Sequence, residues 1–192
     1  MGTQSRKQPS FGRSEEKNWQ VINKIVTSEN PWFRVMESRV TMPDGRETTY
    51  HTLDFIKSAV GVVARRPGEI LLIRQYRFII DEFVWAIPSG GAEKGEDLAI
   101  AAERELLEET GYRAERITRI HSYYSSYGCG NQMFHLYQAE ELSSERKPFD
   151  LNEVLEVKWF SEDEVKRMIF EEQIVDGLSL TPLLFLFASE IS

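Results

Sequence analysis

The stretch from Gly90 to Tyr112, GGAEKGEDLAIAAERELLEETGY, decides how the rest of the chain is interpreted. Its second half predicts one α-helix from Leu98 to Thr110, because this run contains neither glycine nor proline. Asp97 is the expected N-cap, since an aspartate side chain can accept hydrogen bonds from the first free backbone N–H groups. Gly111 is the expected C-terminal cap, because glycine adopts the left-handed conformation without strain. The sequence therefore predicts a helix with two well-defined ends.

One face of this helix carries three glutamates, Glu105, Glu108 and Glu109. Their spacing of i, i+3 and i+4 places them within an arc of about 100°. Leu106 stands on one side of the arc and Ile100 on the other, so we expect both flanks to be packed and the acidic strip to line a groove. Each close pair of like charges there costs about 1 to 4 kcal/mol, depending on the local dielectric. A divalent cation would reverse the sign of this interaction.

The oxygen-only character of the cluster favours Mg²⁺ or Mn²⁺ over zinc, because no cysteine or histidine stands at ligand spacing beside it. Such ions bind few carboxylates together with substrate phosphates, so the expected substrate carries phosphate. The alternative is a solvated acidic helix face, which is what an ordinary glutamate-rich run more often forms.

The spacing of the whole stretch favours the metal site. Five residues separate the first glycine from the first fixed glutamate, and seven more precede the Arg-Glu-Leu triplet. This pattern matches every fixed position of the Nudix box, which here comprises Gly90, Glu96, Arg104, Glu105, Leu106, Glu108, Glu109, Gly111 and Tyr112. The chain thus resembles the Nudix hydrolases, and the resemblance implies an enzyme that cleaves a nucleoside diphosphate linked to another group with the help of divalent metals.

The resemblance also implies roles for single residues. The metal ligands would be Glu105, Glu109 and the backbone carbonyl of Ser89, and Glu108 would either join them or hold a metal-bound water. Support roles in the motif fall to Gly90, Glu96, Arg104 and Gly111, with an ion pair between Glu96 and Arg104 that fixes the loop against the helix.

A general base must reach the attacking water. In the branch of the family that this chain resembles, the base comes from a loop glutamate after the box, and Glu153 in DLNEVLEV matches that position best. Glu108 is a further catalytic candidate, while Glu141, Glu145 and Glu156 are weaker ones that could equally be solvated.

The substrate side of the site is expected before the box. Gln75-Tyr76-Arg77 ends an apolar strand and resembles the QYR triplet of ADP-ribose and GDP-mannose type enzymes, in which the arginine holds substrate phosphate. A guanidinium binds phosphate oxygens through two parallel hydrogen bonds, so we expect Arg77 to be the phosphate ligand. A surface ion pair is the alternative. The run from Trp85 to Gly90 resembles the family's W-E-(L/I)-P-(A/G)-G, with Ala86 in place of the glutamate.

The loop from Tyr124 to Gln132 departs from the typical ADP-ribose enzymes of the family. Tyr127 stands where those enzymes place a proline, and we expect it to contact the substrate or, alternatively, to be a packing residue. Asn131 and Gln132 replace an acidic pair, which leaves neutral hydrogen-bonding groups to face sugar or base.

These features predict metal-dependent hydrolysis of the diphosphate linkage of nucleoside diphosphate sugars, such as GDP-mannose or ADP-ribose, to a nucleoside monophosphate and a sugar phosphate. The alternatives are a dedicated ADP-ribose diphosphatase and a dinucleotide polyphosphate hydrolase. A non-catalytic nucleotide-sugar sensor is a third possibility from another class, and the intact set of glutamates argues against it.

The composition sets wider limits. A chain of 192 residues with 41% hydrophobic content can build one full core and a small appendage. A net charge of -8 argues against binding to a nucleic-acid polymer, which needs clustered Lys and Arg. Cys129 is the single cysteine, so no internal disulfide can form, and a reducing cytoplasm is the expected location. No apolar run approaches the roughly 20 residues of a membrane span, so no membrane association is expected.

Three segments are expected: residues 1–18 as a flexible N-terminus, 19–57 as a small antiparallel β subdomain, and 58–192 as the Nudix hydrolase domain. The subdomain strands are predicted at Trp19–Thr27, Phe33–Thr41 and Glu47–Phe55. The resemblance implies an α/β fold class of the α+β kind, the Nudix fold, in which a mixed β-sheet lies between helices. A capping box of Ser161 with Glu164 predicts a helix to about Glu171, and Thr181-Pro182 predicts the start of the last helix.

A three-stranded sheet of this size buries little apolar surface by itself, so we expect a homodimer. In the family that the chain resembles, the subdomain exchanges between chains and helps form the partner's nucleotide site. Trp32, Phe33 or Arg46 is therefore expected to contact the substrate across the interface, although Trp32 could equally be a core anchor.

Overall fold

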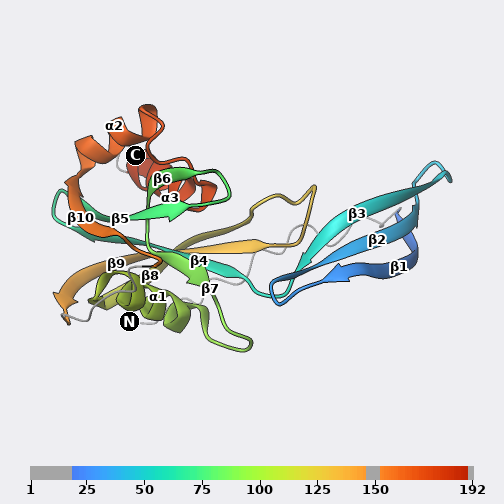
Figure 1. The fold of residues 1–192 in the computed structure, drawn as a ribbon, viewed down its shortest axis with the longest axis horizontal. Helices are drawn as coiled ribbons and strands as arrows, with labels where there is room; N and C mark the ends of the chain where they lie inside the picture. Colours follow the sequence, from blue (N-terminus) through green and yellow to red (C-terminus); the bar gives the residue numbers. More distant parts are fainter. Residues whose placement is uncertain (1–18, 146–151, 190–192) are drawn as a thin grey trace.

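The computed structural model describes residues 19–145 and 152–189, so the expected flexible N-terminus lies outside the described residues. Two sheets and three helices make up the described chain (Figure 1). In chain order the elements are β1 (Gln20–Glu29), β2 (Phe33–Thr41), β3 (Glu47–Phe55), β4 (Ala59–Arg66), β5 (Glu69–Arg77), β6 (Glu82–Ala86), β7 (Ser89–Gly91), α1 (Leu98–Thr110), β8 (Tyr112–Tyr124), β9 (Met133–Ser144), β10 (Glu156–Ser161), α2 (Glu162–Phe170) and α3 (Gly177–Ser189).

Strands β1 to β3 form an antiparallel sheet that stands away from the rest of the molecule (Figure 1). We call this sheet the arm. The turn between β2 and β3 is closed by Gly45, whose φ of 84° suits glycine, and whose N–H donates to the Met42 carbonyl over 2.9 Å. Much of the arm's apolar surface is exposed, namely Trp19, Val21, Ile22, Ile25, Val26, Trp32 and Tyr50.

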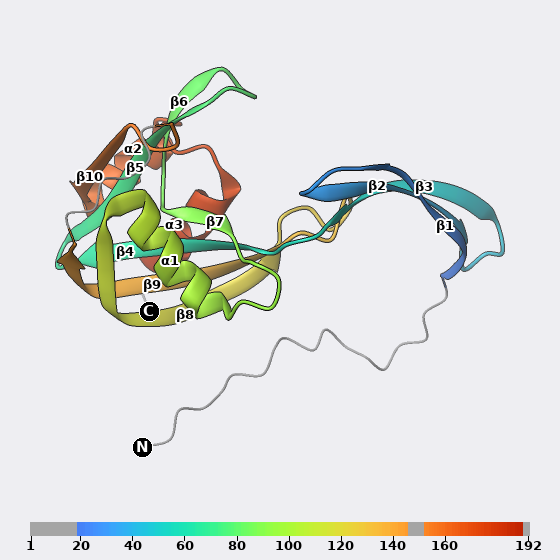
Figure 2. The same cartoon turned by 60° about the horizontal axis from the view of Figure 1, so that its bottom comes forward.

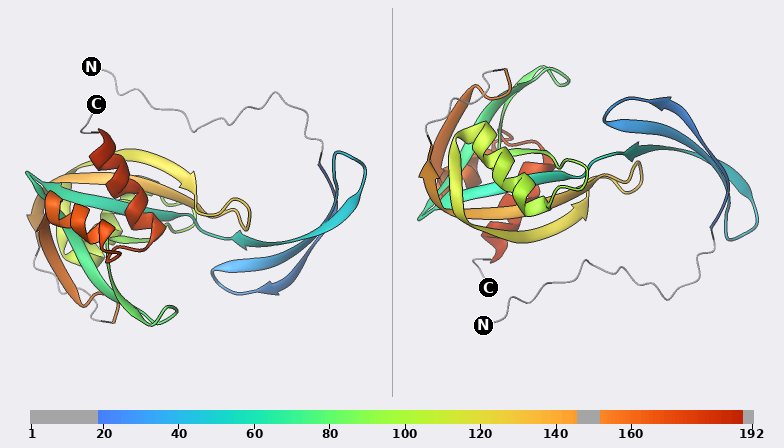
Figure 3. Two further views of the ribbon diagram at one scale, coloured as in Figure 1. Left: turned by 90° about the horizontal axis from the view of Figure 1, so that it is seen from above. Right: turned by 90° about the horizontal axis from the view of Figure 1, so that it is seen from below.

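The main sheet has the strand order β10-β5-β4-β9-β8, with β6 beside β5 and β7 beside β4. Strands β4 and β9 run parallel, and the other pairs are antiparallel, so the sheet is mixed. Helix α1 covers one face, and α2 and α3 cover the other (Figure 3). The predicted arrangement of a mixed sheet between helices is confirmed.

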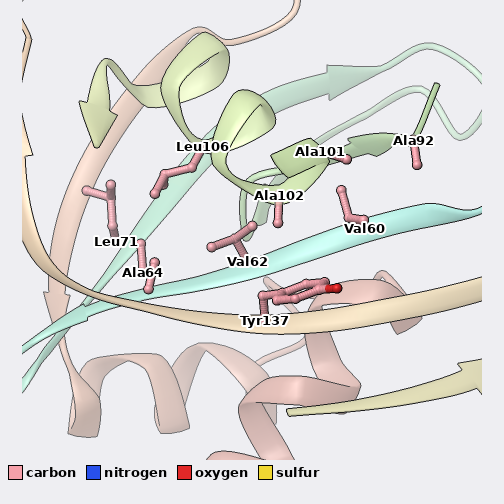
Figure 4. Close-up of a cluster of buried hydrophobic side chains, with 10 residues drawn as sticks. Val60, Val62, Ala64, Leu71, Ala92, Ala101, Ala102, Leu106 and Tyr137 are labelled. Carbon is pink, nitrogen blue, oxygen red and sulfur yellow. The ribbon is translucent and has the colours of Figure 1, made fainter. Parts of the chain in front are cut away.

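Each face of the sheet has its own apolar core. Residues that alternate along β4 point to opposite faces. Val60 and Val62 pack against α1 with Leu106 (Figure 4), whereas Val63 packs against α2 and α3. All four of these side chains are fully buried. The helix that carries the glutamates is therefore fixed rigidly against the centre of the sheet.

Both predicted ends of α1 are confirmed. The Asp97 side chain accepts from the N–H groups of Ala99 and Ile100 over 2.8 and 3.2 Å, and Gly111 adopts a left-handed conformation with φ 71°. The expectation that both flanks of the acidic arc are packed was wrong, since Ile100 is 59% exposed. A single helix on one face of a sheet packs along one stripe only, and Leu106 lies on that stripe.

Two elements differ from the sequence-based expectation. Strand β8 was not predicted, because its polar run RAERITRIHS shows no apolar alternation and is stabilised by pairing along its length with β9. Helix α3 begins at Gly177, and not at Thr181-Pro182, so Pro182 lies inside it. A proline inside a helix costs about 3 kcal/mol, and the burial of Leu178, Leu183 and Leu186 offsets that cost.

The β5–β6 hairpin projects from the body (Figure 2). Its tip exposes the apolar side chains Phe78, Ile79 and Ile80. Among the described residues, no helix is long and apolar enough to cross a membrane.

Candidate active site

Glu109 is the most buried carboxylate of the predicted metal cluster. It is 7% exposed, and its two oxygens accept from the Ser89 backbone N–H at 2.7 Å and from Gln75 Nε2 at 3.1 Å. Burial raises the pKa of Glu109 to about 8, and the charges of Glu105 and Glu153 act in the same direction. The protein thus holds several carboxylates close enough to repel one another.

Glu105 approaches the backbone of β7 very closely. A Cβ atom on Gly90 would lie 2.3 Å from the Glu105 carboxylate, so only glycine leaves room for this carboxylate. Burial also raises the pKa of Glu105, the charges of Glu108 and Glu153 add to the effect, and Arg104 opposes it. The sheet and the helix therefore meet where the acidic groups are concentrated.

Arg104 connects the loop before α1 to the helix. Its Nε and Nη2 donate to Glu96 at 3.0 and 3.1 Å, and Nη2 also donates to the Gly91 carbonyl at 2.9 Å. Its Nη1 reaches Glu105 at 2.8 Å and Glu108 at 3.2 Å. The hydrogen bonds from Arg104 lower the pKa of Glu96. The expected ion pair between Glu96 and Arg104 is thus present, and it also orients two of the clustered glutamates.

Gln75 is a site residue that the sequence analysis did not single out. It is 3% exposed, and its Oε1 accepts from Arg77 Nη2 at 2.6 Å while its Nε2 donates to Glu109. This side chain therefore connects the expected phosphate ligand to the expected metal ligand. The signal for it was a neutral polar residue separated only by Arg74 from the apolar run ILLI in β5.

A cavity of about 670 Å³ opens between these groups, within the size range of small-molecule sites. It brings together eight of the residues expected at the site and adds neighbours from the β5–β6 hairpin. The lining residues are Trp32, Gln75, Tyr76, Arg77, Phe78, Ile79, Ser89, Gly90, Gly91, Glu105, Glu108, Glu109, Asn152 and Glu153. Residues from the arm, the main sheet and the loop before β10 thus share one cavity.

Two expected substrate residues do not line this cavity. Tyr127 is 88% exposed in the loop between β8 and β9, and Arg46 lies in the β2–β3 turn, where it pairs with Asp44 at 2.6 Å. The weaker base candidates also lie apart: Glu141 pairs with Arg116, Glu145 with Arg113 and Glu156 with Arg74. Among all the glutamates considered as bases, Glu153 and Glu108 are the two that line the cavity.

The donors at the cavity fit a hard divalent cation. In the described ranges, no three His, Cys, Asp or Glu side chains are grouped as metal ligands. Glu105 and Glu109 instead accept hydrogen bonds from Arg104, Gln75 and the Ser89 backbone. Burial raises the pKa of both carboxylates, and neighbouring negative charges add to it: those of Glu105 and Glu153 for Glu109, and those of Glu108 and Glu153 for Glu105. A cation beside them would remove the repulsion, which suits Mg²⁺-like ions that keep some of their water ligands.

Known proteins are similar to this chain in sequence or in structure. An ADP-ribose pyrophosphatase of Bacillus subtilis (strain 168) is 28% identical over 79% of this chain and 83% of its own. A methanol dehydrogenase activator of Bacillus methanolicus is 32% identical over the same shares. The crystal structure of an ADP compounds hydrolase superposes with a TM-score of 0.80 at 18% identity, covering 88% of this chain and 92% of that one, which supports the fold.

The family model for the NUDIX domain matches residues 56–177, which include the cavity's β5, β7 and α1 residues together with Glu153. This match spans more than half of the chain. The protein therefore belongs to the Nudix hydrolase family.

Proposed function

We propose that this Nudix hydrolase cleaves the diphosphate linkage of nucleoside diphosphate sugars, such as ADP-ribose or GDP-mannose, to a nucleoside monophosphate and a sugar phosphate. The observation that supports the proposal is a cavity lined by four glutamates together with Arg77 and Trp32. A relative named ADP-ribose pyrophosphatase supports the same substrate class.

The cation would be held by Glu105, Glu109 and the Ser89 carbonyl, with Glu108 as a further ligand or as the holder of a bound water. We propose Mg²⁺ or Mn²⁺. When bound, this cation supplies positive charge that polarises the diphosphate and offsets the negative charge that develops in the displacement. Gly90 keeps the space that Glu105 needs for this role.

The protein's own groups would then do three things. Arg77 would bind phosphate oxygens, and its hydrogen bond to Gln75 fixes its direction. Glu153 would accept the proton of the attacking water while the new P–O bond forms and the bridging P–O bond breaks. Glu96 and Arg104 would keep the loop and the helix in register, as their ion pair indicates.

Substrate recognition outside the diphosphate would rest on aromatic surface. Trp32 lines the cavity of its own chain, whereas it was expected to reach the site of a partner chain. It is 70% exposed there, and an exposed indole face can stack on a nucleotide base. Tyr127 and Arg46 lie outside the cavity of their own chain, so we propose that they reach substrate in the site of a second copy.

A homodimer is the assembly that we propose. Exposed apolar side chains lie on the arm and on the tip of the β5–β6 hairpin. A single copy leaves this apolar surface uncovered, and exposed apolar patches mark sites of protein–protein contact. Light scattering on the full chain tests this, with Val21→Lys as a variant whose charge would disfavour burial of β1. A monomeric wild-type chain would refute the dimer.

Product analysis with Mg²⁺ tests the function itself. The panel consists of ADP-ribose, GDP-mannose, ADP-glucose, UDP-glucose and diadenosine polyphosphates. We expect a nucleoside monophosphate and a sugar phosphate from at least one nucleotide sugar. Cleavage of diadenosine polyphosphates alone would establish the dinucleotide alternative, and no cleavage with Mg²⁺ or Mn²⁺ would contradict the proposal.

A further inference from the structure

The loop between β8 and β9 reaches out to the arm (Figures 1 and 3). At its end, Leu53 of β3 donates its N–H to the Cys129 carbonyl at 2.8 Å, and Asn131 donates its N–H to the Leu53 carbonyl at 3.3 Å. These two bonds form a short parallel bridge between Leu53 and Gly130. The loop thus adds a backbone connection to the last strand of the arm.

The Asn131 side chain extends this connection. Its Oδ1 accepts from the Phe55 N–H at 2.6 Å, and its Nδ2 donates to Asp54 Oδ1 at 2.6 Å. Asn131 was expected to face sugar or base, and in the structure both of its polar side-chain atoms bind β3 instead. We call the contacts of Cys129, Gly130 and Asn131 with Leu53, Asp54 and Phe55 the latch.

The latch needs a glycine at its centre. A Cβ atom on Gly130 would lie 2.7 Å from the Leu53 carbonyl oxygen, a backbone atom that cannot move without breaking the bridge. Gly128, two residues earlier in the same loop, has open space where its Cβ would lie. The two glycines therefore provide a matched pair of substitution sites.

The latch lies next to Trp32. Phe55 packs against Phe33 with ring centroids 5.6 Å apart, and the N–H of Ile56 donates to the Trp32 carbonyl at 3.1 Å. On its other side, Trp32 donates its N–H to Asn30 Oδ1 at 2.9 Å. The backbone of this tryptophan is thus fixed to the end of β3, which the latch in turn holds to the body.

We propose that Gly130 and Asn131 are positioning residues that hold the arm so that Trp32 stays at the cavity, where it contacts the base of the substrate. The inference rests on the proposed function of that cavity. Only residues 56–58 connect β3 to β4 along the chain, so without the latch the arm could turn about this short link. A preformed position for Trp32 reduces the ordering cost of substrate binding.

The kinetic test compares Gly130→Ala and Asn131→Ala with the control Gly128→Ala in the full chain. We expect the first two to raise KM about tenfold, or about 1.4 kcal/mol of binding, with kcat changed less than about twofold. Gly128→Ala should match the wild type. Because the latch acts through Trp32, adding Gly130→Ala to Trp32→Ala should raise KM no further. Additive effects, or an equal rise in Gly128→Ala, would overturn the proposal.

A spectroscopic test is independent of turnover. The full chain is labelled with 5-fluorotryptophan, and Trp32→Phe assigns the ¹⁹F resonance of Trp32. Gly130→Ala should shift or broaden that resonance and leave those of Trp85 and Trp159 in place, while Gly128→Ala should change none. An unchanged Trp32 resonance in Gly130→Ala refutes the latch even if the enzyme is active. If Gly130→Ala moves the Trp32 resonance but the wild-type protein hydrolyses no nucleotide sugar, the latch is supported and the proposed function is refuted.

Discussion

A Cβ atom on Gly90 would lie 2.3 Å from the carboxylate of Glu105, so the space in which this carboxylate sits exists only because residue 90 has no side chain. Gly90 comes from β7 and Glu105 from α1. Their contact is where the sheet fixes the position of the acidic cluster.

Gly90→Ala should therefore disable the site and leave the fold intact. The atoms in the way belong to the flexible end of Glu105, so the free energy of unfolding should change by no more than about 1 kcal/mol. Displacement of Glu105 should lower kcat/KM about 10²-fold. The control is Gly91→Ala, whose Cβ would meet Lys57 at an ordinary 3.7 Å. Equal activities of the two variants would contradict this view of Gly90.

Glu109→Gln tests the metal site. The amide keeps the shape of the side chain but removes the charge that a cation needs. Turnover with Mg²⁺ should fall about 10²–10³-fold, as when one group that stabilises transition-state charge is lost. Calorimetric titration should show weaker Mg²⁺ binding, and thermal unfolding should show a normal fold. Near-normal Mg²⁺-dependent hydrolysis would remove Glu109 from the ligand set.

Glu153→Gln tests the base. Activation of water matters mainly in the transition state, so kcat should fall while KM stays nearly constant. Glu141→Gln is the control, because Glu141 pairs with Arg116 and does not line the cavity. If Glu153→Gln keeps its full kcat, the role passes to Glu108, the other base candidate that lines the cavity.

A buried histidine makes stability depend on pH. His135 is 6% exposed, its Nδ1 lies 2.7 Å from Ser122 Oγ, and burial, followed by the charge of Arg119, lowers its pKa. In the unfolded chain His135 has an ordinary pKa of about 6.5, and in the folded chain its pKa is lower, so the unfolded chain takes up the proton first as the pH falls. The contribution of neutral His135 to the free energy of unfolding is therefore present above about pH 6.5 and is lost as the pH falls through the folded-state pKa.

The free energy of unfolding, measured by denaturant titration at pH 8 and pH 5.5, should thus fall more in the wild type than in His135→Asn. The other histidines are common to both proteins, so their contributions cancel. Equal losses in the two proteins would show that His135 titrates normally in the fold.

The sequence predicted best where one local signal determines one structure. The bounds of α1 follow from Asp97 and Gly111, each of which satisfies backbone groups at one helix end. Strand β8 lacked such a signal, because its partner β9 lies in a later part of the chain. The start of helix α3 before Pro182 was missed, because this helix is stabilised by the burial of its leucines against the rest of the fold, which the local sequence does not show.

The same distinction holds for the site. The glutamates, Ser89 and Arg77 were predictable because their spacing carries a family pattern, and the cavity brings them together. Gln75 was missed because its importance comes from two hydrogen bonds, to Arg77 and to Glu109, that exist only in the folded chain. Asn131 was assigned to the substrate because its contact with β3 joins residues that are far apart in the sequence.

We propose that the glutamate cluster cleaves a diphosphate with the help of a divalent cation. The most direct measurement is a ³¹P NMR time course of ADP-ribose with the wild-type protein and Mg²⁺, repeated with excess EDTA and with Glu109→Gln. The expected result is loss of the diphosphate signals and growth of two phosphomonoester signals in the first sample alone. Diphosphate signals that persist with the wild-type protein and Mg²⁺, for ADP-ribose and for every other nucleotide sugar tested, would contradict the claim.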